Sequence, residues 1–202
     1  MNDSEIFLQW KKIVAKGNLI ETLEFLIKID DFLEGETIAY IFQRIIDSKD
    51  ESSNFQILFL EILDLNNYIK FTQIVNNNYD GTDLEALHGA YERLYFMFLK
   101  ETLDENSNLG FKQLMQINHF ENIEFMFSNK INVHFIHHYL GILLGMTNPK
   151  LVRTNNERIS KYLYRLIDIL GNRREIRDLF DLLGHINRGG TSGSFPDPWG
   201  HY

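Results

Sequence analysis

Residues 154–171 read TNNERISKYLYRLIDILG, and this stretch decides the class of fold. Its apolar side chains return every three or four residues, which is the spacing of one helix face rather than the alternation of a β-strand. Thr154, followed three residues later by Glu157, has the form of a capping box, in which each side chain accepts from the other residue's backbone amide. Gly171 suits a helix end because it adopts left-handed backbone angles without strain. We therefore expect a helix over 155–170.

The same features recur along the rest of the chain. A spacing of three and four residues appears in 20–27 and 55–62, and capping-box forms begin at Asn18 and Thr82. No proline precedes Pro149, so nothing forbids helix before it. We expect an all-α protein of about ten or eleven helices. The other expected helices are 4–16, 18–33, 36–48, 53–65, 67–77, 82–104, 107–117, 119–128, 131–146 and 172–184.

The composition bounds the class of protein. Hydrophobic residues make up 44% of the 202 positions, which is ample for a packed core. The sequence contains no cysteine, which excludes disulfides, zinc ribbons, iron–sulfur clusters and thiol nucleophiles. The N-terminus carries acids where a signal peptide would carry bases, and the apolar stretch Phe135–Met146 is too short to span a bilayer. We expect a cytoplasmic protein that does not interact with membranes.

The net charge of −8 is divided unevenly along the chain. Residues 1–110 hold 20 acidic and 9 basic side chains, a balance of −11. Residues 111–202 hold 8 acidic and 11 basic side chains, a balance of +3. An acidic first half favours basic partners and disfavours nucleic acid, although an acidic solvated surface is also ordinary for a cytosolic protein.

Four segments open with an asparagine and continue into an amphipathic helix. They begin at Asn18, Asn67, Asn118 and Asn172, which are separated by 49, 51 and 54 residues. This period, with two or three helices in each unit, resembles HEAT- and armadillo-type repeats. The resemblance implies antiparallel helical hairpins stacked as a short solenoid, and an irregular helical bundle is the alternative. We expect one domain over 1–186.

Residues 187–202 differ in kind from the rest. Glycine and proline prevent regular structure there, yet Phe195, Trp199 and Tyr202 are large aromatic side chains, which flexible tails usually lack. Three interpretations of this C-terminal tail are possible from the sequence. It docks onto the helices of the same chain, contacts a partner, or is a frayed end.

Three histidines lie on the helix expected over 131–146. His134 and His138 are four residues apart and share a face, with His137 beside them, as in zinc-binding helices. A third ligand would have to come from Glu121 or Glu124 on the preceding helix. The sequence has no His-Glu-x-x-His motif, so packed or surface histidines are the alternative. Glu85-Ala-Leu-His88 gives only one copy of a motif that a di-iron site needs twice.

Basic residues gather near the last expected helix. Arg173, Arg174 and Arg177 follow closely on five further bases: Lys150, Arg153, Arg158, Lys161 and Arg165. A basic face of this kind can bind nucleic acid phosphates. Acids interleave with the bases, so ion pairs within helices are the alternative explanation.

Acidic residues gather at two expected helix–helix corners, without the spacing of a calcium loop. Asp30, Asp31, Glu34 and Glu36 form the first group, and Asp47, Asp50 and Glu51 form the second. They serve either as a rim facing a partner protein or as ordinary loop solvation. Together with the tail aromatics Phe195, Trp199 and Tyr202, they are the candidate partner-binding residues.

The chain has no P-loop, no Rossmann glycine pattern and no Gly-x-Ser-x-Gly elbow. We predict no catalytic, cofactor-binding or metal-binding residues and therefore a non-enzymatic protein-binding module. In size, acidity and its content of Ile, Asn, Lys and Phe, the chain resembles bacterial immunity proteins. That resemblance implies that it neutralises a cognate toxin with a basic domain, rather than binding a small-molecule substrate or nucleic acid. The alternatives are a metal-dependent enzyme using His134, His137 and His138, and a nucleic-acid-binding helical repeat using the basic C-terminal face.

Overall fold

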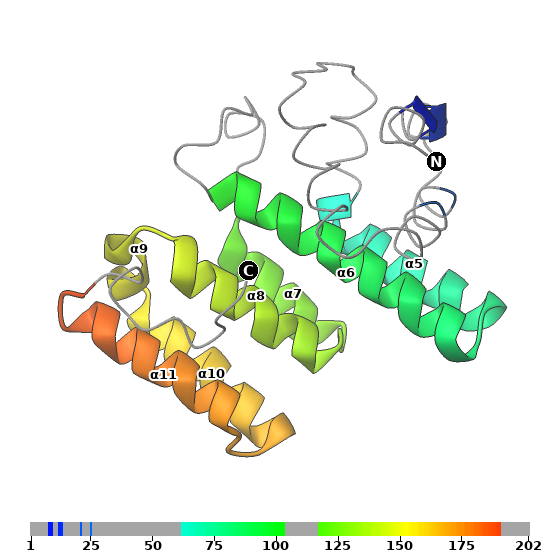
Figure 1. Ribbon diagram of the computed structural model, residues 1–202. Helices are drawn as coiled ribbons and strands as arrows, with labels where there is room; N and C mark the ends of the chain where they lie inside the picture. The colour runs from blue at the N-terminus through cyan, green and yellow to red at the C-terminus, as the bar shows by residue number, and fades with distance from the viewer. Residues whose placement is uncertain are drawn as a thin grey trace. The chain divides into compact units, whose positions relative to one another are not determined.

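The computed structural model describes residues 62–103 and 117–190, together with six single positions nearer the N-terminus (residues 8, 9, 12, 13, 21 and 25). Seven helices, α5 to α11, make up most of the two long stretches, and neither stretch contains a β-strand (Figure 1). The expectation of an all-α fold is confirmed for this part of the chain. Along the same stretches, no helix combines the length and the apolar character needed to cross a bilayer.

The chain divides into two compact units, which are described separately. The first comprises Met1–Leu99 and Asn108–Phe111, and the second comprises Lys100–Ser107 and Lys112–Tyr202. The single domain expected over 1–186 spans both. Most of α6 belongs to the first unit, whereas its last turn belongs to the second.

In the first unit, α5 (Leu65–Asn78) packs against α6 (Gly81–Leu103) through aromatic side chains. The ring centroids of Phe71 and Tyr91 lie 4.6 Å apart, and those of Tyr68 and Tyr91 lie 5.3 Å apart. The hydroxyl of Tyr91 donates to the carbonyl of Ile62 at 3.0 Å, so this buried ring keeps a hydrogen bond. Helix α6 begins at Gly81, with φ of 53°, and not at the cap expected at Thr82.

In the second unit, α8 (Val133–Met146) contacts α7 (His119–Ser128), α10 (Asn156–Leu170) and α11 (Arg174–Asn187). Its sequence is apolar almost throughout, as expected for a helix with neighbours on several sides. The buried residues of α8 are Phe135, Ile136, His137, Tyr139, Leu140, Ile142, Leu143 and Leu144. The three residues between α10 and α11 are too few for anything but a helical hairpin, and the two helices lie side by side (Figure 1).

Asparagines begin three helices of the second unit. The side chains of Asn118, Asn132 and Asn148 accept hydrogen bonds from backbone amides two or three residues further on, at 3.3, 3.0 and 2.9 Å. Asn148 begins α9 (Pro149–Thr154), a short helix that was not expected. A proline in the first turn after an asparagine is nevertheless a recognisable helix start.

The capping box expected at Thr154 and Glu157 is wrong. Thr154 ends α9 instead, where its hydroxyl donates to the carbonyl of Lys150 at 2.9 Å. Asn155 occupies the N-cap of α10 without a side-chain cap bond. The expected stop at Gly171 is confirmed, with φ of 78° and a backbone hydrogen bond to Ile167 of 2.8 Å.

The asparagines that mark the expected repeat do not occupy equivalent positions. Asn118 is the N-cap of α7, but Asn67 lies inside the first turn of α5, because Asp64 is the cap there. Asn172 precedes Arg173, the N-cap residue of α11. Asn18 lies outside the described residues. The HEAT- or armadillo-like stacking stays a prediction.

Candidate functional site

One face of α8 lines a cavity of about 480 Å³ in the second unit, which we call the α8 pocket. Positions 134, 137, 138, 141, 142, 145 and 146 recur at intervals of three and four, so a single helix face carries all of them. These residues are His134, His137, His138, Gly141, Ile142, Gly145 and Met146. Leu170, Arg173, Glu175 and Ile176 complete the lining from α10 and α11, and Lys100 does so from the last turn of α6.

Two glycines on this face of α8 leave room for the cavity. A Cβ atom at Gly145 would meet nothing within 4 Å, and one at Gly141 would meet only the Leu179 side chain, at 3.7 Å. A larger side chain at either position would project into the space that the pocket occupies. The volume lies within the range typical of small-ligand and side-chain pockets.

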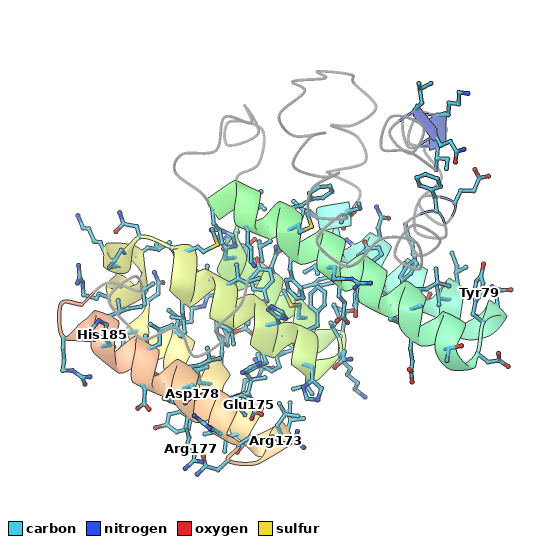
Figure 2. The ribbon with its side chains drawn as sticks, viewed as in Figure 1. Tyr79, Arg173, Glu175, Arg177, Asp178 and His185 are labelled. Carbon is cyan, nitrogen blue, oxygen red and sulfur yellow. The ribbon has the colours of Figure 1, made fainter. Side chains whose placement is uncertain are left out.

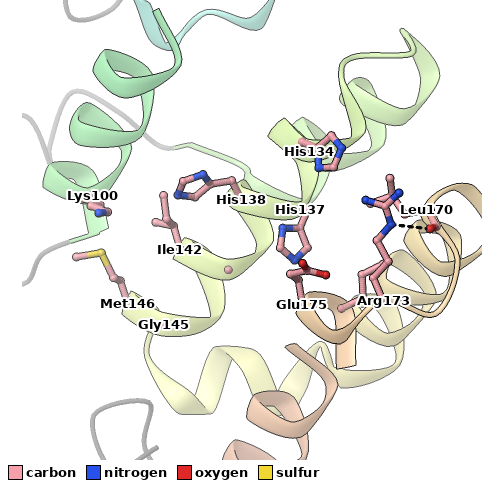
Figure 3. A pocket seen from close by; sticks show the side chains of 12 residues that line it. Lys100, His134, His137, His138, Ile142, Gly145, Met146, Leu170, Arg173 and Glu175 are labelled. Carbon is pink, nitrogen blue, oxygen red and sulfur yellow. Dashed lines mark hydrogen bonds between the residues drawn. The ribbon is translucent and has the colours of Figure 1, made fainter. Parts of the chain in front are cut away.

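The two ends of the α8 pocket differ in charge (Figure 3). Lys100 and His138 lie toward one end. Arg173, Glu175 and His137 lie toward the other, so positive and negative groups both occur there. The guanidinium Nε of Arg173 donates to the carbonyl of Leu170 at 3.0 Å, and this bond orients the side chain at the rim.

Both inner histidines of the pocket are held in the neutral form. Burial, with smaller contributions from the charges of Lys100 and His137, lowers the pKa of His138 to about 4. Burial also lowers the pKa of His137, although a backbone hydrogen bond and the charge of Glu175 oppose the shift. At neutral pH each imidazole therefore offers one donor and one acceptor rather than a positive charge.

A buried polar cluster between α7 and α8 lies outside the pocket lining. The hydroxyl of Tyr139 and Nδ1 of His119 are joined by a hydrogen bond of 2.8 Å, and Asn122 donates to the same hydroxyl at 3.4 Å. Burial lowers the pKa of His119 to about 4 and raises that of Tyr139. Both groups are neutral near pH 7, and their bonding ties α7 to α8.

The metal hypothesis receives no support from the geometry. His134, His137 and His138 do line one cavity, and His134 and His138 lie on one face of α8, as their spacing predicted. Among the described residues, however, no three His, Asp or Glu side chains are grouped closely enough to hold a metal ion. Neither Glu121 nor Glu124 lines the α8 pocket, so the third ligand expected from α7 is not brought to it.

The histidine of the single Glu-x-x-His motif has a packing role in the first unit. His88 Nε2 is 3.0 Å from Oδ1 of Asn76, and its ring packs edge-on against Phe71 at 6.0 Å between centroids. These contacts join α5 and α6. The contacts of His88 therefore agree with a histidine that packs between helices.

Most arginines of the basic face form hydrogen bonds, ion pairs or ring contacts with other groups of the second unit. Arg165 forms an ion pair of 3.0 Å with Glu124, and its guanidinium lies 3.8 Å from the ring centroid of Phe127. Arg158 donates to Tyr162, and Arg153 donates to the carbonyl of Ile186. The contacts of Arg165 and Arg153 join different helices, whereas the bond from Arg158 to Tyr162 lies within α10; ion pairs within one helix were expected. Nucleic-acid binding by this face was the alternative hypothesis, and nothing in the structure tests it.

The first half of α11 does contain one interaction of the expected kind. Arg174 and Asp178, four residues apart, approach to 4.0 Å. Arg173, Glu175 and Arg177 are neighbours in the same part of the helix, so both signs of charge alternate there (Figure 2). An alternation of this kind makes a weaker phosphate-binding surface than a uniform basic one.

The ten candidate partner-binding residues all lie outside the described residues. They are Asp30, Asp31, Glu34, Glu36, Asp47, Asp50, Glu51, Phe195, Trp199 and Tyr202. Their role in binding a partner stays a prediction.

Sequence reasoning found the pocket histidines but not the rest of the pocket. Lys100 was missed because it is 34 residues before His134 in the chain, and no local pattern joins them. A signal was present in Gly141 and Gly145, which repeat the four-residue spacing of His134 and His138. Two glycines that follow two histidines along the same helix face leave space that neighbouring helices need not fill.

Comparison with known proteins found no matching protein family, no matching curated protein and no matching solved structure.

Proposed function

We propose that this chain is a non-enzymatic protein-binding module, and that the α8 pocket receives an apolar side chain of its partner. The observation that carries the proposal is the pocket itself, a cavity of about 480 Å³ with apolar walls and charged groups at its ends. Pockets that enclose an anchoring side chain of a partner supply much of the affinity at protein interfaces.

The lining of the α8 pocket favours binding over chemistry. Among the described residues, its lining includes no serine, threonine or cysteine that could act as a nucleophile. Its two inner histidines are kept neutral mainly by burial. What the walls offer is a fixed shape, apolar contact and a few placed polar groups.

More specifically, we propose that the chain is a bacterial immunity protein, which binds a cognate toxin and neutralises it. The support is the acidic first half, with a balance of −11 over residues 1–110, which would attract a basic toxin domain. In such a complex, charge accelerates association, and buried contacts such as those of the α8 pocket slow dissociation.

The neighbouring genes provide the first test. We expect a large toxin-like gene beside this one. We also expect that cells producing the C-terminal domain of that toxin will grow again when the present chain is co-expressed. No such neighbour, or no rescue by a chain that is well expressed, would remove the immunity proposal. A stable complex with a non-toxic partner would support the proposal of a protein-binding module and contradict the proposal of an immunity protein.

The acidic groups provide a second test on the same complex. Charge reversal in a double variant, Asp30→Lys with Asp31→Lys, should slow association about tenfold at low salt and much less at high salt. The matched control is Asp168→Lys with Asp181→Lys, since both of these acids are exposed in the second unit. Equal effects of the two double variants would refute a specific role for the first acidic group.

A further inference from the structure

Two of the helices that line the α8 pocket run in the same direction. A Cβ atom at Gly141 of α8 would lie 3.7 Å from the Leu179 side chain of α11. Four residues earlier in each helix, Glu175 lies close enough to His137 for its charge to act on the pKa of the imidazole. Because both contacts advance by the same number of residues, α8 and α11 are parallel, and the colours of Figure 1 run along them in the same direction.

This arrangement brings one end of the pocket toward Gly190, which precedes residues 191–202 of the C-terminal tail. Gly145 is level with Leu183, and Gly190 is seven residues further on, about 10 Å along the axis of α11. Packed helices are themselves about 10 Å apart. The nine residues from Gly190 to Trp199 can span up to about 30 Å. Trp199 can therefore reach the whole pocket.

Exposed apolar side chains occur where the C-terminal end of α8 meets α9 and α11. Met146, which lines the pocket, is 38% exposed, and Leu151 of α9 is 42% exposed. Helix α9 packs against α11, and Arg153 donates to the carbonyl of Ile186 in the last turn of α11 at 3.4 Å. Apolar surface is thus available close to the start of residues 191–202, and covering it removes that surface from water, which is favourable.

The sequence of residues 191–202 suits an apolar pocket. It contains three large aromatic side chains, and Asp197 is its only Asp, Glu, Lys or Arg. Pro196 and Pro198 fix φ at two positions, so this segment loses less conformational entropy on docking than an ordinary chain. Trp199 follows them directly and has the largest apolar surface of the three aromatics. Docking within one chain also avoids the cost of bringing two molecules together.

We propose that the C-terminal tail docks on the second unit of its own chain, with the indole ring of Trp199 in the α8 pocket. The cavity of about 480 Å³ has room for this ring, and Ile142, Met146 and Ile176 supply apolar contact. The docking itself goes beyond the proposed function. Its consequence rests on that function, because the tail occupies the site that a partner's side chain needs and the partner must displace it.

Fluorescence of the whole chain tests the docking without any partner. Trp10 is the other tryptophan of the sequence, so Trp10→Phe leaves Trp199 as the single reporter. We expect blue-shifted emission and slow quenching by acrylamide. Gly145→Leu fills the pocket and should release the ring; for a ring docked about four-fifths of the time, quenching becomes about fivefold faster. Gly89→Leu in α6, where a Cβ atom also meets nothing within 4 Å, is the matched control and should leave quenching unchanged.

NMR locates the ring on a chain whose pocket is unaltered. NOEs should join the indole protons of Trp199 to the methyl groups of Ile142, Met146 and Ile176. A synthetic peptide of residues 191–202 should shift the same methyl signals in the variant Trp199→Ser. It should shift them much less in the wild type, where the tail of the chain competes for the pocket.

Each contrary result overturns a defined part of the proposal. Quenching of Trp199 as fast as in the urea-unfolded chain would overturn the docking. A protected ring that is unaffected by Gly145→Leu, or NOEs to other methyl groups, would overturn the assignment to the α8 pocket. Protection that grows with protein concentration would show that the tail enters a second copy. All of these results are obtained without a partner, so they are distinguishable from a failure of the proposed function, in which no partner protein binds although the ring docks.

Discussion

Acid should destabilise the second unit through His119, and the size of the effect follows from its burial. The pKa of this ring is about 4 in the folded protein, because burial penalises the charged form, whereas its ordinary value is 6.5. The unfolded chain thus binds more protons between these values, so the free energy of unfolding falls as pH falls from 6.5 to 4. The difference of 2.5 units corresponds to about 3 kcal/mol below pH 4 and about 2 kcal/mol at pH 5.

The variant His119→Gln isolates this contribution from those of the other histidines. Its side-chain oxygen can still accept from Tyr139, but it does not titrate. We expect the wild type to lose about 2 kcal/mol more than the variant between pH 7 and pH 5. The measurement is urea unfolding at each pH, followed through the NMR amide signals of α7 and α8, so that the second unit is observed by itself.

A control variant separates the titration from the hydrogen bond. Tyr139→Phe removes the 2.8 Å bond to His119 and leaves the ring buried, so it should lower stability at every pH and keep the acid sensitivity. Parallel pH dependences for the wild type and His119→Gln would refute the reasoning. So would an NMR titration that placed the pKa of His119 near 6.5.

Two further changes test the packing of the second unit. The hydroxyl of Thr147 is buried and makes no hydrogen bond within the described residues, so Thr147→Val should raise the free energy of unfolding by about 1 kcal/mol in urea denaturation. Thr154→Val, which removes a hydroxyl that bonds to a carbonyl, should give no such gain, and a loss at Thr147 would contradict the account. Gly171→Ala should cost about 1–3 kcal/mol, because φ of 78° with ψ of 175° is strained for alanine. Gly89→Ala, within α6 and with open space at its Cβ, should be neutral or stabilising in the same thermal and urea scans.

Much of the helical structure in the described residues could be predicted from local sequence. The spacing around Ile159 and Leu166 repeats at 3.6 residues, and this period is a property of one helix that needs no partner. Gly171 ends α10 where it was expected, because its backbone angles are local as well. The expected cap at Thr154 failed because the competing partner, the carbonyl of Lys150, belongs to a helix that was not expected.

The candidate site was only partly predictable for the same physical reason. His134 and His138 share a face through their spacing alone, so the sequence determined that they would lie together. Their environment depends on atoms from other helices, such as Lys100 and Glu175, which lie at long sequence separation. The neutral state of His138 is likewise a consequence of burial, and spacing carries no information on burial by a distant segment.

By itself, then, the sequence determined an all-α fold, the excess of acid in the first half of the chain, and the shared face of the α8 histidines. Each of these depends on composition or on short-range periodicity. Only the tertiary structure decided that Gly141 and Gly145 open onto a cavity, that Lys100 from α6 helps to line it, and that Arg165 pairs with Glu124 on another helix. Those features depend on which helix faces meet, and many packings of the same amphipathic helices would satisfy the sequence pattern equally well.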